Sequence, residues 1–317
     1  MTENEFLLED RKAKIQSVMR QYGEENFYIS FSGGKDSTVL HHLVDEALPG
    51  NKIPRVYSNT GIEYNEVVKF VRGLAEEDSR IQIIEPRVPI RKMLEEEGYP
   101  FKSKFHSAKV ERYQKHGLDR KSVRIYLGME PTKNGVYLTG DNSCPKILKY
   151  QFEEGTSFKI SNKCCDRLKK DLLHEWQREN KKTYGILGIM PDEGGQRASA
   201  KCLAFSDGKL KNFQPLVPLT KAWEDWYIKK RGFRLCKLYY PPYNFERTGC
   251  KGCPYNIHIQ RELDTLDKFF PNERKQCERI WKPVYEEYRR IGYRLRPLEF
   301  GRQTTIDEFL PQEEKPD

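Results

Sequence analysis

The stretch that most limits the fold is FYISFSGGKDSTVLHHLVDEAL, residues 27–48. Apolar residues alternate over 27–31, as in a strand, and recur at helical spacing over 39–44. A turn with two adjacent glycines, SGGKDS, joins the two patterns. A helix that begins at such a turn has unpaired N–H groups that face outward, and these groups bind phosphate together with the positive end of the helix dipole. The turn is therefore predicted to bind phosphate. The alternative is a helix cap whose glycines serve only the turn.

The turn differs from two common nucleotide loops. In a Walker loop Ser or Thr follows Gly-Lys, whereas Asp36 follows Lys35 here, and no G-x-G-x-x-G occurs. The segment instead resembles the SGGxDS pyrophosphate loop of the PP-loop (adenine nucleotide alpha hydrolase-like) superfamily. That resemblance implies that ATP binds with Mg²⁺ and that a substrate attacks the α-phosphorus, which yields an adenylate and pyrophosphate. In this reading Lys35 neutralises the phosphates and Asp36 helps to hold the metal. The residues implied to bind pyrophosphate are Ser32, Gly33, Gly34 and Ser37.

Two further strands follow the turn. Val56 and Tyr57 lie in an apolar segment before a helical pattern over 67–74, and a third strand pattern begins at Arg80. Alternating strands and helices, with turn residues at the carboxyl end of each strand, predict an α/β fold with a doubly wound parallel sheet. The ligand is expected at those strand ends.

The stretch YSNTGIEYNEV, residues 57–67, resembles the Asp-Thr-Gly element of the phosphoadenylyl-sulfate (PAPS) reductase family and of the ATP sulfurylase small subunit. Asn59 stands where those proteins often have Asp, which argues against a carboxylate role there. Thr60 and Gly61 are expected to contact the adenosine. An ordinary lead-in to a helix is the alternative.

A basic stretch follows over 102–124. It has eight Lys and Arg residues against Glu111 and Asp119, and the whole chain has 56 Lys and Arg against 47 Asp and Glu. This imbalance predicts contact with a polyanion such as tRNA or DNA, although a solvated helix face is the alternative. The segment GYPFKSK resembles a Gly-x-Pro-x-x-Ser-Lys element of some bacterial and phage members of the family. That resemblance makes Ser103 and Lys104 candidates for substrate binding.

Four of the eight cysteines form two close pairs. Cys164 and Cys165 are adjacent, and Cys250 and Cys253 form a C-x-x-C. Zinc sites usually use two C-x-x-C pairs, because neighbouring side chains diverge, so the adjacent pair favours a [4Fe-4S] cluster. The arrangement resembles the cluster ligands of adenylyl-sulfate (APS) reductases and of DNA phosphorothioation enzymes. Zinc and free thiols are the alternatives. The remaining cysteines are expected to be buried apolar residues: Cys144, Cys202, Cys236 and Cys277.

A buried strand pattern over 184–189 leads to Glu193 and Arg197. In the reductase family the corresponding strand ends in a Gly-x-Arg-x-Asp/Glu-Glu turn with a following arginine. Met190 stands where that turn usually has arginine, while Glu193 and Arg197 match. The resemblance implies that Glu193 binds the nucleotide and that Arg197 acts in catalysis, by meeting a phosphate or sulfate with two N–H groups. A salt bridge within the loop is the alternative.

Composition and motifs predict three parts of the chain. Residues 1–235 are expected to form a PP-loop nucleotide-binding domain with a basic insert near 100–135, and residues 236–300 a helical subdomain that bears cysteines and covers the cluster. Residues 301–317 are expected to be a mobile tail. In that tail a set of four residues resembles a peptide that docks on sliding clamps, although chance is the alternative: Gln303, Ile306, Phe309 and Leu310. No apolar run approaches the roughly 18 residues of a membrane span, so a cytoplasmic protein is expected.

The resemblance to the PAPS reductase family extends over residues 27–255. Sulfonucleotide reductases carry a C-terminal Glu-Cys-Gly-type tail and commonly have an altered phosphate loop, whereas this chain has no cysteine after Cys277 and keeps SGGKDS. We therefore expect an ATP-using iron–sulfur enzyme that adenylates a substrate, a nucleic acid, and supports sulfur insertion with a sulfur or electron donor protein. The alternatives are a reductase that forms sulfite from APS or PAPS, and a non-catalytic nucleotide-binding module.

Overall fold

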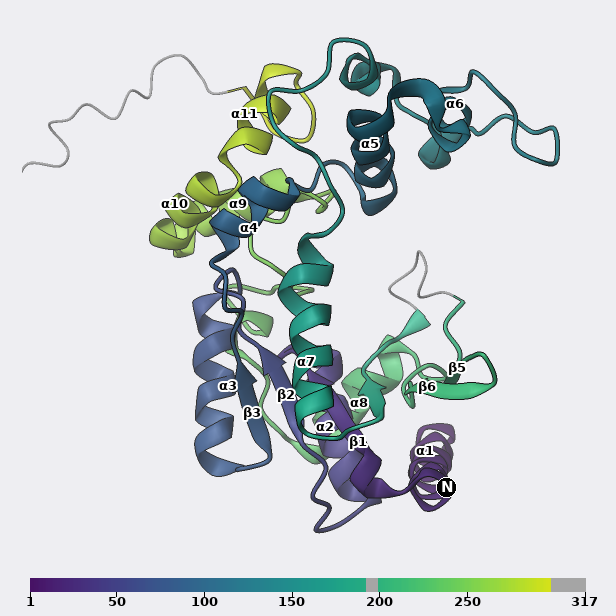
Figure 1. Ribbon diagram of the computed structural model, residues 1–317. Helices are drawn as coiled ribbons and strands as arrows, with labels where there is room; N and C mark the ends of the chain where they lie inside the picture. The colour runs from purple at the N-terminus through teal and green to yellow at the C-terminus, as the bar shows by residue number, and fades with distance from the viewer. Residues whose placement is uncertain (192–198, 298–317) are drawn as a thin grey trace, which may run out of the picture.

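The computed structural model describes residues 1–191 and 199–297 (Figure 1). These residues form one six-stranded sheet with the order β3-β2-β1-β4-β6-β5. The strands that pair with β1, and β3 and β6 beyond them, run parallel to it, and β5 pairs antiparallel with β6. The sheet confirms the predicted doubly wound α/β fold. The strands are β1 (Phe27–Phe31), β2 (Arg55–Ser58), β3 (Ile81–Ile84), β4 (Tyr184–Leu187), β5 (Leu203–Ser206) and β6 (Lys209–Phe213).

The strand order places β1 at the point where the chain reverses its direction of winding. Ile29 of β1 lies opposite Arg55 of β2 on one side and opposite Ile186 of β4 on the other. In open α/β sheets ligands bind outside the carboxyl ends of the strands at such a point. The SGGKDS turn follows β1 directly, so the fold places it where a ligand is expected.

Helices cover both faces of the sheet. Trp176 of α7 (Asp171–Glu179) packs against Tyr28 and Val56 on one face. The main core contains the alternate β1 residues, such as Ile29, and the apolar side chains of α2. The remaining helices of the α/β layer are α1 (Glu3–Tyr22), α2 (Lys35–Ala47), α3 (Asn65–Glu77) and α8 (Lys221–Arg231).

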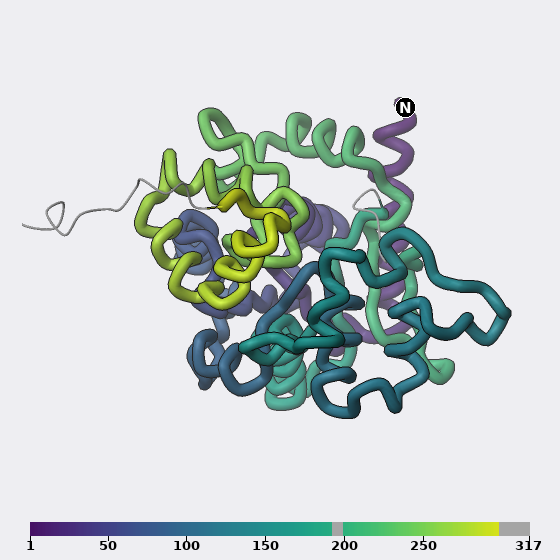
Figure 2. Tube along the Cα trace, turned by 90° about the horizontal axis from the view of Figure 1, so that it is seen from above, coloured from purple at the N-terminus to yellow at the C-terminus, as the bar shows by residue number. Residues whose placement is uncertain are grey.

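A second group of helices lies beyond the carboxyl ends of the strands, at the top of Figure 1. Seen from above in Figure 2, the segment after β3 and the C-terminal helices lie side by side. The Lys102 amide donates to Tyr288 Oη (2.7 Å), and Arg294 Nη1 donates to the Lys102 carbonyl (2.8 Å), which join the two segments. These helices are α4 (Ile90–Glu97), α5 (Lys104–His116), α6 (Lys121–Leu127), α9 (Ile259–Phe269), α10 (Pro271–Ile280) and α11 (Lys282–Arg290).

Short helical turns connect these elements. The 3-10 turns are η1 (Glu24–Asn26), η2 (Gly117–Asp119), η3 (Gly140–Asn142), η4 (Lys146–Phe152) and η8 (Lys237–Tyr239), and η5 (Asp166–Lys170) is a π-helical turn. No helix in the described ranges is both long enough and apolar enough to cross a membrane.

Candidate nucleotide and metal site

The SGGKDS turn is held by its own side chains. Ser32 Oγ lies 2.9 Å from Ser37 Oγ, and Ser37 Oγ donates to the Gly34 carbonyl (3.0 Å). Gly33 has φ +68°, and a Cβ atom there would lie 2.6 Å from Val71 Cγ2 of α3. A left-handed backbone packed this closely requires glycine. The turn therefore has a fixed shape at the start of α2, as its predicted phosphate-binding role requires.

Helix α8 faces the charged residues of the turn. Lys35 Nζ donates to Asp225 Oδ1 (3.1 Å) and lies 3.5 Å from Glu224 Oε2, while the Asp36 carboxyl lies beside that of Glu224. Glu224 is only 1% exposed. Burial and the neighbouring Asp36 raise the pKa of Glu224 to about 8. The two motif residues Lys35 and Asp36 thus contact two carboxyl groups, Glu224 and Asp225, that lie about 190 positions later in the sequence.

The segment before the C-x-x-C contacts the phosphate loop. The Lys35 amide donates to Tyr239 Oη (3.0 Å), and Tyr239 Oη lies 2.7 Å from Thr248 Oγ1. A Cβ atom at Gly34 would lie 3.4 Å from Thr248 Oγ1. Thr248 precedes Cys250 by two positions. The loop predicted to bind pyrophosphate and the second cysteine pair therefore lie at the same end of the sheet.

The turn after β2 reaches the cysteines through Glu63. The Thr60 amide donates to Glu63 Oε2 (2.8 Å), and the Thr60 hydroxyl donates to the same carboxylate (2.9 Å). Glu63 Oε1 lies 3.0 Å from Lys169 Nζ, and Lys169 interacts with the Cys250 thiol. Gly61 has φ +81° and its carbonyl accepts from Gln276 Nε2 (3.1 Å). Thr60 is thus linked through Glu63 and Lys169 to the second cysteine pair, and Gly61 contacts the C-terminal helices through Gln276.

The two cysteine pairs come together. Cys164 Sγ donates to Cys165 Sγ across 4.0 Å, which raises the pKa of Cys164 and lowers that of Cys165. Burial raises the pKa of both Cys250 and Cys253, and each of these thiols also interacts with Cys165. All four predicted metal ligands therefore converge from segments about 85 positions apart.

The sulfurs as a set are more widely spread than ligands of one zinc ion, while Cys164 Sγ and Cys165 Sγ lie 4.0 Å apart. Within residues 1–191 and 199–297, the one group of three or more potential ligand atoms that all lie within 4.8 Å is His41, Asp45 and Asp78. No three of the four cysteine sulfurs are therefore that close. Zinc–sulfur bonds of about 2.3 Å in a tetrahedron would place the sulfurs roughly 3.8 Å apart. The donor set and its spread fit a larger iron–sulfur group better than a single ion.

Residues 26–126 match the profile of the phosphoadenosine phosphosulfate reductase domain family. This segment, about a third of the chain, is therefore similar to that domain family. The match includes β1, the SGGKDS turn and the turn after β2.

Several solved structures are similar to the chain at low identity. A PAPS reductase from Candida auris is 11% identical, with 79% of this chain and 96% of that chain covered and a TM-score of 0.45. An FMN adenylyltransferase from Candida glabrata in complex with ATP is 12% identical, with 78% and 61% covered and a TM-score of 0.46. A U34-tRNA thiolase from Methanococcus maripaludis with its [4Fe-4S] cluster is 16% identical, with 88% and 78% covered and a TM-score of 0.36. No curated protein sequence matches significantly.

Ser103 and Lys104 lie at the start of α5. Ser103 Oγ accepts from the His106 amide (3.2 Å), so it caps the helix. Lys104 is exposed and lowers the pKa of Cys165 by its charge, after the larger effect of the Cys164 thiol. Lys104 therefore lies near the predicted cluster, while the substrate role of Ser103 stays a prediction. Glu193 and Arg197 lie outside the described residues.

Cys277 packs against Gly252 of the C-x-x-C turn. It is fully buried, and a Cβ atom at Gly252 would lie 2.9 Å from Cys277 Sγ. Burial raises the pKa of Cys277 to about 12. Both properties disfavour Cys277 as a nucleophile. Cys144 and Cys236 are buried as predicted, while Cys202 is partly exposed and accepts from Arg11 Nη1 (3.7 Å).

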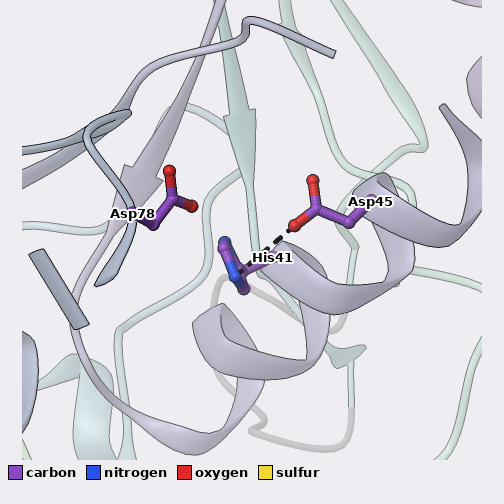
Figure 3. A group of neighbouring side chains, drawn as sticks. All are labelled: His41, Asp45 and Asp78. Carbon is purple, nitrogen blue, oxygen red and sulfur yellow. Dashed lines mark ion pairs between the residues drawn. The ribbon is translucent and has the colours of Figure 1, made fainter. Parts of the chain in front are cut away.

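The side chains of His41, Asp45 and Asp78 form a second group (Figure 3), on α2 and just before β3. Arg55 Nη2 lies 2.6 Å from Asp45 Oδ1, and Arg80 pairs with both aspartates at 2.8 Å. Arg55 Nε also donates to His41 Nδ1 (3.1 Å). The guanidinium groups occupy the lone pairs that a metal would need, so this group is an ion-pair network that holds the starts of β2 and β3.

Four site residues were not predicted from the sequence: Glu224, Asp225, Tyr239 and Lys169. They contact the motifs across long separations, which no local pattern reveals. Glu224 carried one signal, because it lies between Trp223 and Trp226 on a helix with an aromatic face. A carboxylate is almost never fully buried unless it is paired with another group, so its place on this face suggests a partner.

Proposed function

We propose that the protein is an ATP-using iron–sulfur enzyme that adenylates a nucleic acid and supports sulfur insertion into it. The observation that carries the proposal is the meeting of the phosphate loop and the second cysteine pair, through Thr248 beside Gly34 and two positions before Cys250. A substrate activated at the α-phosphate would then lie close to the cysteines.

The loop residues would act mainly by position and charge. Backbone N–H groups at the start of α2 and the Lys35 ammonium would hold the β- and γ-phosphates as the bond to the α-phosphate breaks. Asp36 would share in binding Mg²⁺, which keeps several water and phosphate ligands beside one or two carboxylates. Thr60 and Gly61 would contact the adenosine, and Glu193 and Arg197 would contribute from the segment after β4. These assignments predict that substitutions in the loop weaken nucleotide binding and do not change the metal content of the cysteine site.

Cys164, Cys165, Cys250 and Cys253 would hold a [4Fe-4S] cluster. The spread of their sulfurs supports this assignment, and Lys104 and Lys169 would offset part of the negative charge of four thiolates. A bound cluster supplies an iron site for sulfur or electron transfer. The sulfur or electron donor would be a second protein. Tyr255, whose hydroxyl donates to Ser107 Oγ (3.3 Å), lies near Cys164, Cys165 and Cys253.

The segment after β3 supports a nucleic acid as the substrate. Lys109 Nζ lies 4.8 Å from the centre of the exposed Phe105 ring, and Tyr137 is also exposed. Basic groups with exposed rings suit phosphates and unstacked bases. Two basic side chains have acidic partners instead, since Lys115 pairs with Glu111 and Arg124 with Glu130. The proposal covers tRNA and DNA alike.

The boundaries 1–235, 236–300 and 301–317 remain predictions, as does the cytoplasmic location. The four residues that resemble a sliding-clamp peptide lie outside the described residues.

The family match favours one other function, reduction of APS or PAPS to sulfite. The two activities give different products, so anaerobically purified protein is incubated with ATP and Mg²⁺, and separately with APS or PAPS and a thiol donor. We expect pyrophosphate from ATP and no sulfite. Sulfite without pyrophosphate would replace the proposal by the reductase function, and nucleotide binding without either product would indicate a binding module.

The metal assignment is tested by elemental analysis. We expect about four iron and four acid-labile sulfides per chain, and loss of both in Cys250→Ser and in Cys165→Ser. Cys202→Ser is the matched control, because Cys202 lies away from the group beside Arg11, and it should keep the wild-type iron content. One zinc per chain in colourless protein would contradict the cluster.

A further inference from the structure

Glu224 is a buried carboxylate without a hydrogen-bond partner. Only 1% of the residue is exposed, and neither carboxyl oxygen accepts a hydrogen bond from any part of the chain that the structure describes. Among residues 1–191 and 199–297 the cation paired with it is Lys35 Nζ at 3.5 Å, and the Asp36 carboxyl lies beside it. A buried carboxylate that faces a second carboxylate and has one ammonium group at 3.5 Å is costly, so its presence at the phosphate loop requires an explanation.

Helix α8 is fixed in a way that holds Glu224 against the loop. Thr220 Oγ1 accepts from the Trp223 amide (3.2 Å) at the start of the helix, and Trp223 Nε1 donates to the Asn4 carbonyl (3.0 Å). Further along, Tyr227 Oη and Arg231 Nε both donate to Glu46 of α2 (3.0 and 2.9 Å). Side chains three and seven positions apart lie on one helix face, so Glu224 shares the face that is pinned to α2.

The local charge disfavours pyrophosphate without a cation. The raised pKa of Glu224 means that this carboxyl ionises at neutral pH only with a cation beside it; once it is ionised, Asp36, Glu224 and Asp225 carry three negative charges against one positive charge on Lys35, which leaves two negative charges. Asp225 is mostly exposed, so solvent screens it, whereas Glu224 is shielded from water. A divalent cation would balance the two negative charges and would provide the buried oxygens with a partner.

We propose that Glu224 and Asp36 together bind a divalent cation at the pyrophosphate loop, and that this site binds the cation before nucleotide arrives. Mg²⁺ takes one or two carboxylates and fills its other positions with water and phosphate oxygens, which matches this pair. Once the cation has satisfied the carboxylates, Lys35 is released from Glu224 and can pair with phosphate. The inference deepens the proposed nucleotide site and rests on it.

The test measures metal binding without nucleotide. Mn²⁺ is titrated into the full-length, anaerobically purified protein, and free Mn²⁺ is followed by electron paramagnetic resonance, with Mg²⁺ as competitor. We expect one Mn²⁺ per chain in the wild type and at least roughly tenfold weaker binding in Glu224→Gln, since even residues outside the first ligand sphere change metal affinity by that factor. Asp225→Asn, on the same helix but exposed, should change the affinity less than about threefold.

Folding and activity are separated from metal binding by two further measurements. Gln has the shape of Glu and removes a repulsion with Asp36, so Glu224→Gln should unfold at the same temperature as the wild type or higher. No Mn²⁺ bound by the wild type, or equal binding by Glu224→Gln, overturns the inference. Glu224-dependent Mn²⁺ binding without pyrophosphate release would keep this site and refute adenylation. If Glu224→Gln releases pyrophosphate with the Mg²⁺ dependence of the wild type, adenylation would be kept and the Glu224 cation site would be refuted.

Discussion

Gly33 is the residue on which the shape of the phosphate loop most depends. A Cβ atom there would lie 2.6 Å from Val71 Cγ2 and 2.9 Å from Val67 Cγ1, in addition to the strain of φ +68°. Gly33→Ala should therefore lower the free energy of unfolding by about 1–3 kcal/mol and weaken ATP binding. Urea unfolding and calorimetric titration with ATP measure the two effects.

Gly50→Ala is the matched control for Gly33→Ala. Gly50 has φ +75°, but a Cβ atom there would meet no other atom within 4 Å. The Gly50→Ala variant should lose only the unfolding free energy that the backbone strain costs, and it should bind ATP with the affinity of the wild type. Equal stability and equal ATP affinity for the two variants would contradict the role given to close packing at Gly33.

A buried histidine sets a pH dependence of stability. His106 is fully buried between Tyr126 Oη and Gln151 Oε1, both at 2.8 Å. Burial lowers the pKa of His106 to about 4, whereas an unfolded histidine titrates near 6.5. The unfolded state therefore binds a proton first as pH falls, so stability is lost below pH 6.5 and continues to fall until about pH 4.

The contribution of His106 is the difference between the unfolding free energies at pH 7 and at pH 5, compared between the wild type and variants. Between pH 7 and pH 5, His106 should account for about 2 kcal/mol of lost unfolding free energy. His106→Gln should flatten that part of the profile, while His116→Gln, at an exposed position of the same helix, should keep the wild-type profile. Urea unfolding at both pH values gives the comparison, and parallel profiles for all three proteins would refute the assignment.

Among the elements, the strand–turn–helix units were the most predictable from the sequence. Their periodicity is local, so the pattern over 27–48 was sufficient to predict β1, the turn and α2. The antiparallel pair β5–β6 was not predicted, although Asp207 and Gly208, both with positive φ, form a typical hairpin turn. Both strands are short, β5 at the edge of the sheet and β6 beside it, so their periodic signal is weak and only the turn could have revealed this pair.

The ion-pair network at the starts of β2 and β3 leads to a prediction about stability. Asp45 pairs with the fully buried Arg55 and with Arg80. Asp45→Asn should lower the free energy of unfolding by about 3 kcal/mol, because a buried guanidinium loses its carboxylate. Iron content and ATP binding should not change, as measured by elemental analysis and calorimetry.

A surface pair serves as the control for this network. Glu9→Gln removes the exposed partner of Lys12 and should change stability by less than about 1 kcal/mol. A loss of bound metal in Asp45→Asn without a loss of stability would instead identify His41, Asp45 and Asp78 as a metal site.

At the scale of the whole molecule, the site joins segments that the sequence keeps far apart. The loop at Gly34 and the cysteine at position 250 were each predictable, because each belongs to a short motif. Their proximity was not, because it depends on Tyr239, Thr248 and the packing of the C-terminal helices on the sheet. Those helices also contact the α/β layer through the Glu273 carboxylate, which accepts from the Asn65 amide (3.1 Å). Burial of Glu224 depends in the same way on how α8 packs on α2.

We propose that the SGGKDS loop holds ATP while ATP is cleaved between its α- and β-phosphates. The most direct test is pyrophosphate release from ATP and Mg²⁺ by anaerobically purified protein, with tRNA, with DNA and with neither. We predict release that one nucleic acid stimulates and that Lys35→Ala abolishes without changing the brown absorbance of the cluster. No release under any of these conditions would contradict the claim.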